Sequence, residues 1–136
     1  MGVLFKNSDI TVYNKYYNNY LDCELYQKTV IKDVGWNNKA TSTVTDKGLL
    51  MADSVVIIVD KITNYISPKQ FARLTVDDML NYFTFAIGDK IVKGECEFEV
   101  TAIAPFRIAD LENNIDDVVN IVSVRQLSDH WEVECK

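Results

Sequence analysis

The sequence predicts a mainly β protein: a small β-barrel or sandwich with one or two short helices and long loops. Three observations support this class. Apolar and polar residues alternate in several short segments, β-branched residues gather in a short apolar run, and long stretches with the spacing of an amphipathic helix are missing. Because 136 residues suffice for one domain with its own core, we expect a single domain over residues 1–136.

Two strands and two loops are expected before residue 43. Ile10 to Tyr13 alternates and is predicted to be a short strand, whereas Asn14 to Asp22, rich in Tyr and Asn, is expected to be a loop. Tyr26 to Trp36 is a longer predicted strand that ends around Gly35. The polar segment Asn37 to Ser42 is expected to be a second loop.

A turn and a central strand are predicted next. Asp46, Lys47 and Gly48 form the turn, because Gly adopts a positive φ without steric cost. Val55 to Val59 is β-branched at every position and is bounded by Asp residues on both sides. Such a run is typical of a central strand with apolar side chains on both faces.

Two short helices are expected after this strand. Ser67 is a suitable N-cap, Pro68 suits the first helical position and Gln70 completes a capping box. Thr75 is a second N-cap, followed by acidic residues at the positive end of the helix.

The second half of the chain returns to β-type patterns. Thr84 to Ile87 and Lys90 to Lys93 are predicted strands, separated by a Gly88–Asp89 turn. Glu95 to Ile103 shows the clearest alternation in the chain, with Glu and Thr residues on one face and apolar residues on the other.

The chain ends in one loop and two further predicted strands. Asp110 to Asp117 is expected to be an acidic loop. Val118 to Leu127 is a long predicted strand, and His130 to Cys135 alternates as the last one. About eight short strands with two minor helices suit a barrel or sandwich better than a doubly wound α/β fold.

The residues give no sign of an enzyme, so we expect no catalytic residue, no metal and no cofactor. The single histidine, His130, has no metal-ligand pattern around it, and the glycines form no phosphate-binding motif. Cys23, Cys96 and Cys135 are odd in number and widely spaced, which favours reduced thiols in a cytosolic setting.

The net charge and the hydropathy argue against two kinds of partner. A formal net charge of −6 argues against sequence-independent binding to nucleic acid, which needs Lys and Arg on the phosphates. No stretch approaches the roughly 20 apolar residues of a membrane span, and the N-terminus does not resemble a signal peptide. We therefore expect no membrane partner.

Acidic residues form a stripe at alternate positions of two predicted strands. Glu95, Glu97 and Glu99 share one face of the first strand, and Glu132 and Glu134 share one face of the last. One interpretation is a solvated outer face with counter-charges elsewhere. The other is a surface that meets a basic partner or repels DNA.

Apolar and aromatic residues beside two predicted loops are candidates for a subunit interface. Leu49, Leu50 and Met51 follow the predicted turn and are either a return to the core or an exposed anchor. Tyr16 and Tyr17 belong to a tyrosine-rich segment that either contacts a partner or covers the open end of a barrel.

Several of these motifs, in this order, resemble an uncharacterised family from the structural-gene modules of tailed phages and prophages of Gram-positive bacteria. The motifs are short and span most of the chain: Ile10 to Tyr16, Thr29 to Trp36, Thr45 to Leu49, Phe85 to Gly94 and His130 to Val133. The closing segments are similar to those of small head-tail connector proteins, also called stoppers or head-completion proteins.

The resemblance implies a structural role in the virion, after assembly in the cytoplasm of the host bacterium. The chain would form a homo-oligomeric ring of six-fold or twelve-fold symmetry at the neck, between portal or adaptor proteins and the tail, with DNA passing through without specific binding. A tail-completion or tail-terminator protein, or a free-standing barrel that binds a ligand or nucleic acid, are the alternatives.

Two expectations follow for a ring. The segment Gly35 to Asp53 would be an arm that reaches a neighbouring subunit, because a heterologous interface pairs two different patches. If the two acidic strands paired with each other, their glutamates would merge into one patch that lines the channel and keeps DNA from adhering.

Overall fold

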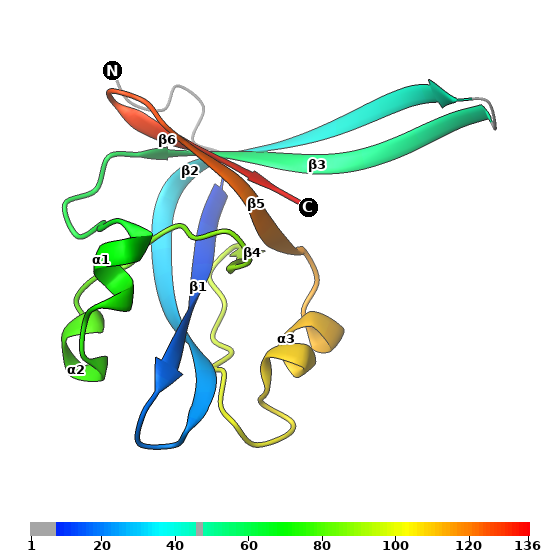
Figure 1. The fold of residues 1–136 in the computed structure, drawn as a ribbon. Coiled ribbons are helices and arrows are strands. Elements are labelled where there is room, and N and C mark those ends of the chain that lie inside the picture. The colour runs from blue at the N-terminus through cyan, green and yellow to red at the C-terminus, as the bar shows by residue number, and fades with distance from the viewer. Residues whose placement is uncertain (1–7, 46–47) are drawn as a thin grey trace.

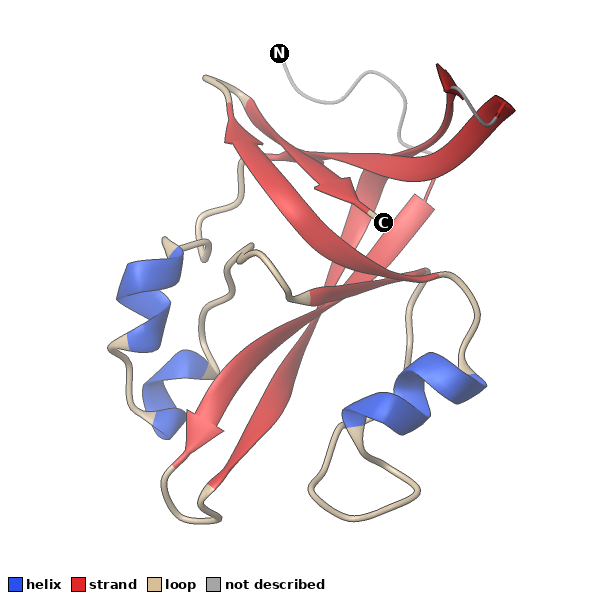
Figure 2. Ribbon diagram, turned by 45° about the vertical axis from the view of Figure 1, so that its right-hand side comes forward, coloured by secondary structure: helices blue, strands red, loops and turns tan. Residues whose placement is uncertain are grey.

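The computed structural model describes residues 8–45 and 48–136; for residues 39–45 and 48–53 it describes the backbone and not the side chains. Over this part of the chain, six antiparallel strands close into a barrel in the order β1-β2-β3-β6-β5-β4 (Figure 1). Three short helices lie outside the barrel wall (Figure 2). The predicted mainly β class is confirmed, in its barrel form. The elements are β1 (Ser8–Asn18), β2 (Cys23–Thr45), β3 (Gly48–Asp60), α1 (Pro68–Ala72), α2 (Val76–Met79), β4 (Lys90–Lys93), α3 (Ile108–Asn114), β5 (Val118–Gln126) and β6 (His130–Cys135).

The core fills the barrel with alternate residues of its strands, as the pleat requires. Ile57 and Val59 of β3 and Val133 of β6 are fully buried, and each such side chain contributes roughly 1.5–3 kcal/mol. Part of this core is an aromatic cluster whose ring centroids lie 4.5–6.0 Å apart. It consists of Tyr65, Phe83, Phe85 and Trp131.

The predicted central strand is confirmed, because β3 pairs with β2 on one side and with β6 on the other. Val55, Ile57 and Val59 are buried, while the alternate residues Val56 and Ile58 are half-buried. The apolar second face is therefore only partly covered within the described part of the chain.

The strands β2 and β3 form a hairpin that extends beyond the strands that flank it in the barrel. β1 covers β2 only as far as Val34, and β6 covers β3 only from Val55 onward. Beyond those points the two strands pair with each other alone, from Lys39↔Ser54 to Thr45↔Gly48. This two-stranded ribbon, residues 39–45 and 48–54, is called the hairpin arm below, and it extends away from the barrel (Figure 1).

Two expected loops are in fact strand. The segment 37–42 continues β2 because a partner strand satisfies its backbone groups at every position. The segment 14–18 continues β1, since its tyrosines favour extended backbone and it pairs with residues 23–27 of β2. The chain reverses after Asn18, whose side chain accepts hydrogen bonds from the backbone N–H of Tyr20 and Leu21. The predicted turn at residues 46–48 falls partly outside the described residues.

The two predicted helices are confirmed, and a third was missed. Ser67 caps α1 in a capping box with Gln70, and Thr75 caps α2. The expected acidic loop at 110–117 instead contains most of α3, which forms because Leu111 buries itself completely between β-strand side chains.

Two predicted strands are absent from the described ladders. Residues 84–87 form an irregular loop, and residues 95–103 run without a strand partner. Gly94, with φ of +87°, turns the chain away after β4. The Thr11 hydroxyl donates a hydrogen bond to Gly94 O and accepts one from Cys96 N. The segment after Gly94 is thus held to β1 by a side chain and not by backbone pairing between strands. The alternation in this segment reflects burial of Cys96 against the core without sheet pairing.

Candidate functional site

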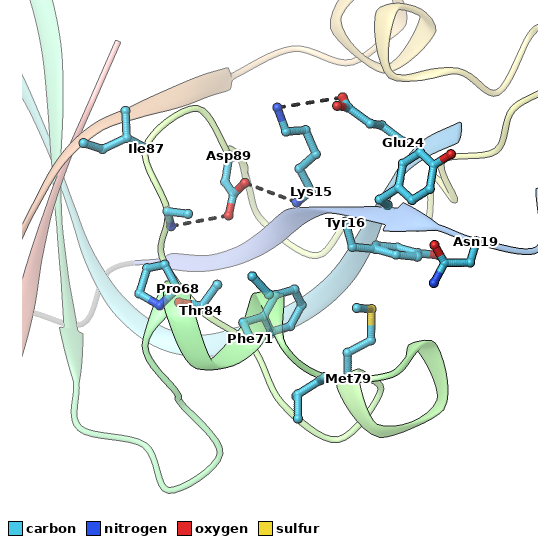
Figure 3. A pocket seen from close by; sticks show the side chains of 14 residues that line it. Lys15, Tyr16, Asn19, Glu24, Pro68, Phe71, Met79, Thr84, Ile87 and Asp89 are labelled. Carbon is cyan, nitrogen blue, oxygen red and sulfur yellow. Dashed lines mark hydrogen bonds and ion pairs between the residues drawn. The ribbon is translucent and has the colours of Figure 1, made fainter. Parts of the chain in front are cut away.

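One edge of β1 is left without a strand partner. β4 pairs with β1 only from Ile10 to Tyr13. It begins at Lys90, directly after a turn in which Gly88 has φ of +93°. On this edge, over the described residues, β1 continues past Tyr13 with no neighbouring strand. A pocket of about 500 Å³ lies there, between residues 15–19 and the helices α1 and α2 (Figure 3). It is called the edge pocket below.

A buried carboxylate fixes the wall of the edge pocket at the β4 end. Asp89 is 3% exposed, and its carboxylate accepts hydrogen bonds from Asn14 Nδ2 at 2.8 Å, Lys15 N at 3.2 Å and Ala86 N at 3.3 Å. Asn14 Nδ2 also donates to Thr84 O at 2.6 Å, and Thr84 N donates to Asn14 Oδ1 at 3.2 Å. These bonds fasten the irregular loop 84–89 to β1.

Burial raises the pKa of the Asp89 carboxyl above its ordinary value, because the charged form loses its water. The hydrogen bonds from Asn14 and from the backbone of Lys15 and Ala86 oppose this shift. The arrangement is that of a structural clamp, since Lys15 and Ala86 line the pocket and Asn14 ties Asp89 to Thr84 behind its wall.

The edge pocket has two chemically different sides. Lys15 and Glu24 extend to one side of β1, where Lys15 Nζ lies 3.8 Å from Glu24 Oε2 (Figure 3). On the other side Tyr16 faces Phe71 of α1 and Met79 of α2 (Figure 3). An extended segment beside β1 would therefore meet a charged rim with alternate residues and an apolar floor with the others.

The floor of the pocket is attached to the barrel by hydrogen bonds at α2 and by buried side chains of both helices. Gln27 Nε2 of β2 donates to Met79 O at 2.7 Å and to Tyr82 O at 2.8 Å. Phe71 and Met79 are 3% and 4% exposed, so each anchors its helix against the barrel. The floor is thus a built part of the fold.

The structure places the predicted interface residues in two different regions. Tyr16 is half-buried and Tyr17 is 51% exposed, and both line the edge pocket. Leu49, Leu50 and Met51 lie in the β3 strand of the hairpin arm, and their side chains lie outside the description.

The expected pairing of the two acidic strands with each other is wrong. Both edges of β6 are occupied, by β3 and by β5, so the segment with Glu95, Glu97 and Glu99 cannot pair with it. Their role in a channel stays a prediction.

Several of these glutamates already have partners. Glu99 Oε1 lies 3.1 Å from Lys28 Nζ, and Glu132 Oε2 lies 3.7 Å from Arg125 Nη1. Glu134 Oε2 accepts a hydrogen bond from Ser123 at 3.4 Å. These contacts fit the interpretation of a solvated outer face with counter-charges.

Little in the described residues suggests chemistry. No group of three or more His, Cys, Asp or Glu side chains there could hold a metal ion. His130 Nδ1 lies 2.6 Å from Asp129 Oδ1, and Nε2 lies 3.6 Å from Glu132 Oε1, so the imidazole contacts two carboxylates and no metal-ligand set. The absence of an activity stays a prediction.

Sequence reasoning missed the edge pocket itself. Its floor comes from helices whose caps were recognised, but nothing in the sequence shows which strand edge those helices flank. The sequence did contain one relevant residue, Asp89, which lies directly after Gly88 and before a predicted strand. A carboxylate that becomes buried at such a position needs hydrogen-bond donors around it.

In the part of the chain that the structure describes, no helix has the length and apolar character needed to cross a membrane.

A family model matches residues 5–136, and the chain therefore belongs to the family of unknown function DUF6751. No curated protein and no solved structure is similar enough to the chain to count as a match.

Proposed function

We propose that the chain, as a member of this family, is a structural subunit that assembles with copies of itself into a ring in a tailed bacteriophage particle. The position we propose is the neck, where the ring connects portal or adaptor proteins to the tail as a head-tail connector or stopper. Its role there is structural and not catalytic. The particle would be assembled in the cytoplasm of the host bacterium.

The observation that carries this proposal is the hairpin arm. An isolated two-stranded ribbon is marginally stable in water, and its outer edges present unpaired N–H and C=O groups. Seven pairs of residues, from Lys39↔Ser54 to Thr45↔Gly48, extend beyond the strands that flank them in the barrel. A ribbon of this kind becomes more stable when a partner covers it and pairs its free backbone groups.

The direction of the arm favours a ring. The arm projects from one side of the barrel, and the helices α1 and α2 lie on the opposite side (Figures 1 and 2). A contact between an arm and a distant patch on the next copy is heterologous, and such contacts close into rings when the rotation between copies allows it.

The phage setting is supported by the motifs described above and by the charge. A formal net charge of −6 suits a wall along which duplex DNA must slide without adhering. The alternative is a tail-completion or tail-terminator protein, which would also form a ring. The position of the ring in the particle distinguishes this alternative from a neck protein.

The test is to shorten the arm without touching the barrel. Lys39 and Ser54 are directly paired, so an Asn-Gly turn can replace residues 40–53 and close the hairpin there. Sedimentation equilibrium should show the intact chain as a closed oligomer and the shortened chain as a monomer, and that monomer should still unfold in one cooperative transition. Equal assembly of both proteins would contradict the proposal.

A further inference from the structure

We infer that the edge pocket is the receptor for the hairpin arm of a neighbouring copy, whose β3 strand adds to the open edge of β1. The inference rests on the proposed ring and names the surface that the arm contacts. It is built from the backbone of β1, the two sides of the pocket and the free edge of the arm.

The open edge of β1 offers backbone hydrogen bonds. In an antiparallel strand, alternate residues direct N–H and C=O to opposite neighbours. Asp9 O accepts from Gly94 N at 2.7 Å, and Lys15 N donates to the Asp89 carboxylate, so the odd-numbered residues of β1 face away from β2. By the same alternation, Tyr17 directs its N–H and C=O toward the edge pocket. Within the described residues no strand pairs with them.

The length of the open edge suits a short added strand. Residues 14–18 span about 16 Å at roughly 3.3 Å per residue. The clamp at Asp89 closes the end nearest β4, and α1 and α2 flank the edge along its length (Figure 3). Strand addition to an exposed edge takes affinity from main-chain bonds and specificity from side-chain pockets.

The two sides of the pocket define the occupant. An added strand would direct alternate side chains to the apolar floor at Phe71 and Met79, and the others to the Lys15–Glu24 rim. The occupant must therefore be an extended segment with a free backbone edge and an apolar residue at every second position.

The β3 half of the hairpin arm meets these requirements. Its outer edge, residues 48–54, has no strand partner in the described part of the chain. The sequence there reads Gly48-Leu49-Leu50-Met51-Ala52, so either phase of the alternation brings Leu together with Met or Ala to one face. The β2 half, with Lys39 and mostly Thr and Ser from 41 to 45, does not. We therefore assign the contact to β3.

The positions of arm and pocket favour a head-to-tail contact over an isologous pair. The arm and the α1–α2 side of the barrel lie at opposite sides of the molecule (Figure 1). Each copy thus offers one arm and one pocket to two different neighbours, as a closed ring requires.

The experiment separates the two halves of the contact. The first protein has the shortened arm and an intact pocket. The second has an intact arm and a blocked pocket, made by Tyr17→Pro, which removes an edge N–H while leaving the bonds to β2. A second way of blocking is Ile87→Asp, at a pocket-lining residue that is 76% exposed and therefore tolerant of the change. Ile103→Asp, at a residue that is 73% exposed and outside the pocket, is the matched control.

The expected result is a complementation pattern in native mass spectrometry. Each blocked or shortened protein alone should be monomeric, and a mixture should give a heterodimer with one copy of each and nothing larger. The Ile103→Asp protein should assemble as the unchanged chain does.

The outcomes distinguish this inference from the proposed function. If both blocked-pocket proteins assemble normally while the shortened-arm protein stays monomeric, the arm has another receptor and only this inference fails. If the shortened-arm protein assembles normally, the proposed role of the arm fails. If Tyr17→Pro does not fold, Ile87→Asp alone decides between these outcomes.

Discussion

At the scale of single residues, burial and hydrogen bonding decide what the barrel tolerates. Ile57 lies in the part of β3 that belongs to the barrel, opposite Val133 of β6, and is completely buried. An Ile57→Asp variant would place an unpaired carboxylate among Val59, Trp131 and Val133 of the core cluster. We expect a cost of more than about 4 kcal/mol, which is a large part of the roughly 5–15 kcal/mol by which an ordinary domain is stable.

The measurement is soluble yield together with a thermal melt of any protein recovered. Val122→Asp, at a residue that is 39% exposed on β5, is the control and should fold normally. A native-like transition for Ile57→Asp would refute the central placement of this strand.

Asp89 leads to a pH-dependent prediction. Because burial raises its pKa in the folded state, the folded protein binds this proton more tightly than the unfolded chain does. The stability contributed by Asp89 is therefore greatest below the ordinary carboxyl pKa of 3.8 and falls as the pH rises through the raised pKa. At neutral pH we expect Asp89→Asn to cost about 1–3 kcal/mol, because an amide cannot accept all three hydrogen bonds.

Urea unfolding of both proteins between acidic and neutral pH tests this sign. The advantage of the wild-type protein over Asp89→Asn should grow as the pH falls toward the ordinary carboxyl pKa. An advantage that shrinks on acidification would mean that the hydrogen bonds outweigh burial and that the pKa is lowered.

At the scale of elements, the hairpin arm should be separable from the barrel. We expect the double variant Leu49→Ser and Leu50→Ser to change the free energy of unfolding of the isolated monomer by no more than about 0.5 kcal/mol, as is usual for residues outside the core. The same variant should weaken assembly, because the added strand would lose its apolar contacts. If the isolated monomer unfolds instead, these residues belong to the core and the arm does not serve as an interface.

The same scale shows where prediction from sequence worked. The caps at Ser67 and Thr75 and the strand at Lys90–Lys93 were recognised because their signals are local. Residues 37–42 and 14–18 were misassigned because their polar composition is typical of loops, and only a partner strand makes them β. The alternation at 95–103 predicted a ladder that the turn at Gly94 prevents. The edge pocket could not be foreseen, since it depends on which strand edge α1 and α2 flank.

At the scale of the whole molecule, the proposed ring allows a test of whether the acidic residues face a DNA channel. In an assembled particle we expect the triple variant Glu95→Lys, Glu97→Lys and Glu99→Lys to slow DNA ejection at low ionic strength. New phosphate contacts would add salt-sensitive affinity, and screening should abolish the effect at high salt. Ejection of the variant at the wild-type rate in low salt would show that these residues do not face the channel.

The central claim is that the hairpin arm of one copy joins the barrel of the next. A cryo-EM map of the assembled oligomer tests it most directly, because a strand added to a sheet has an unmistakable path. We predict density for residues 48–54 alongside residues 14–18 of the adjacent copy, between that strand and the helices α1 and α2. Arms that extend freely into solvent, or that fold back on their own barrel, would contradict the claim.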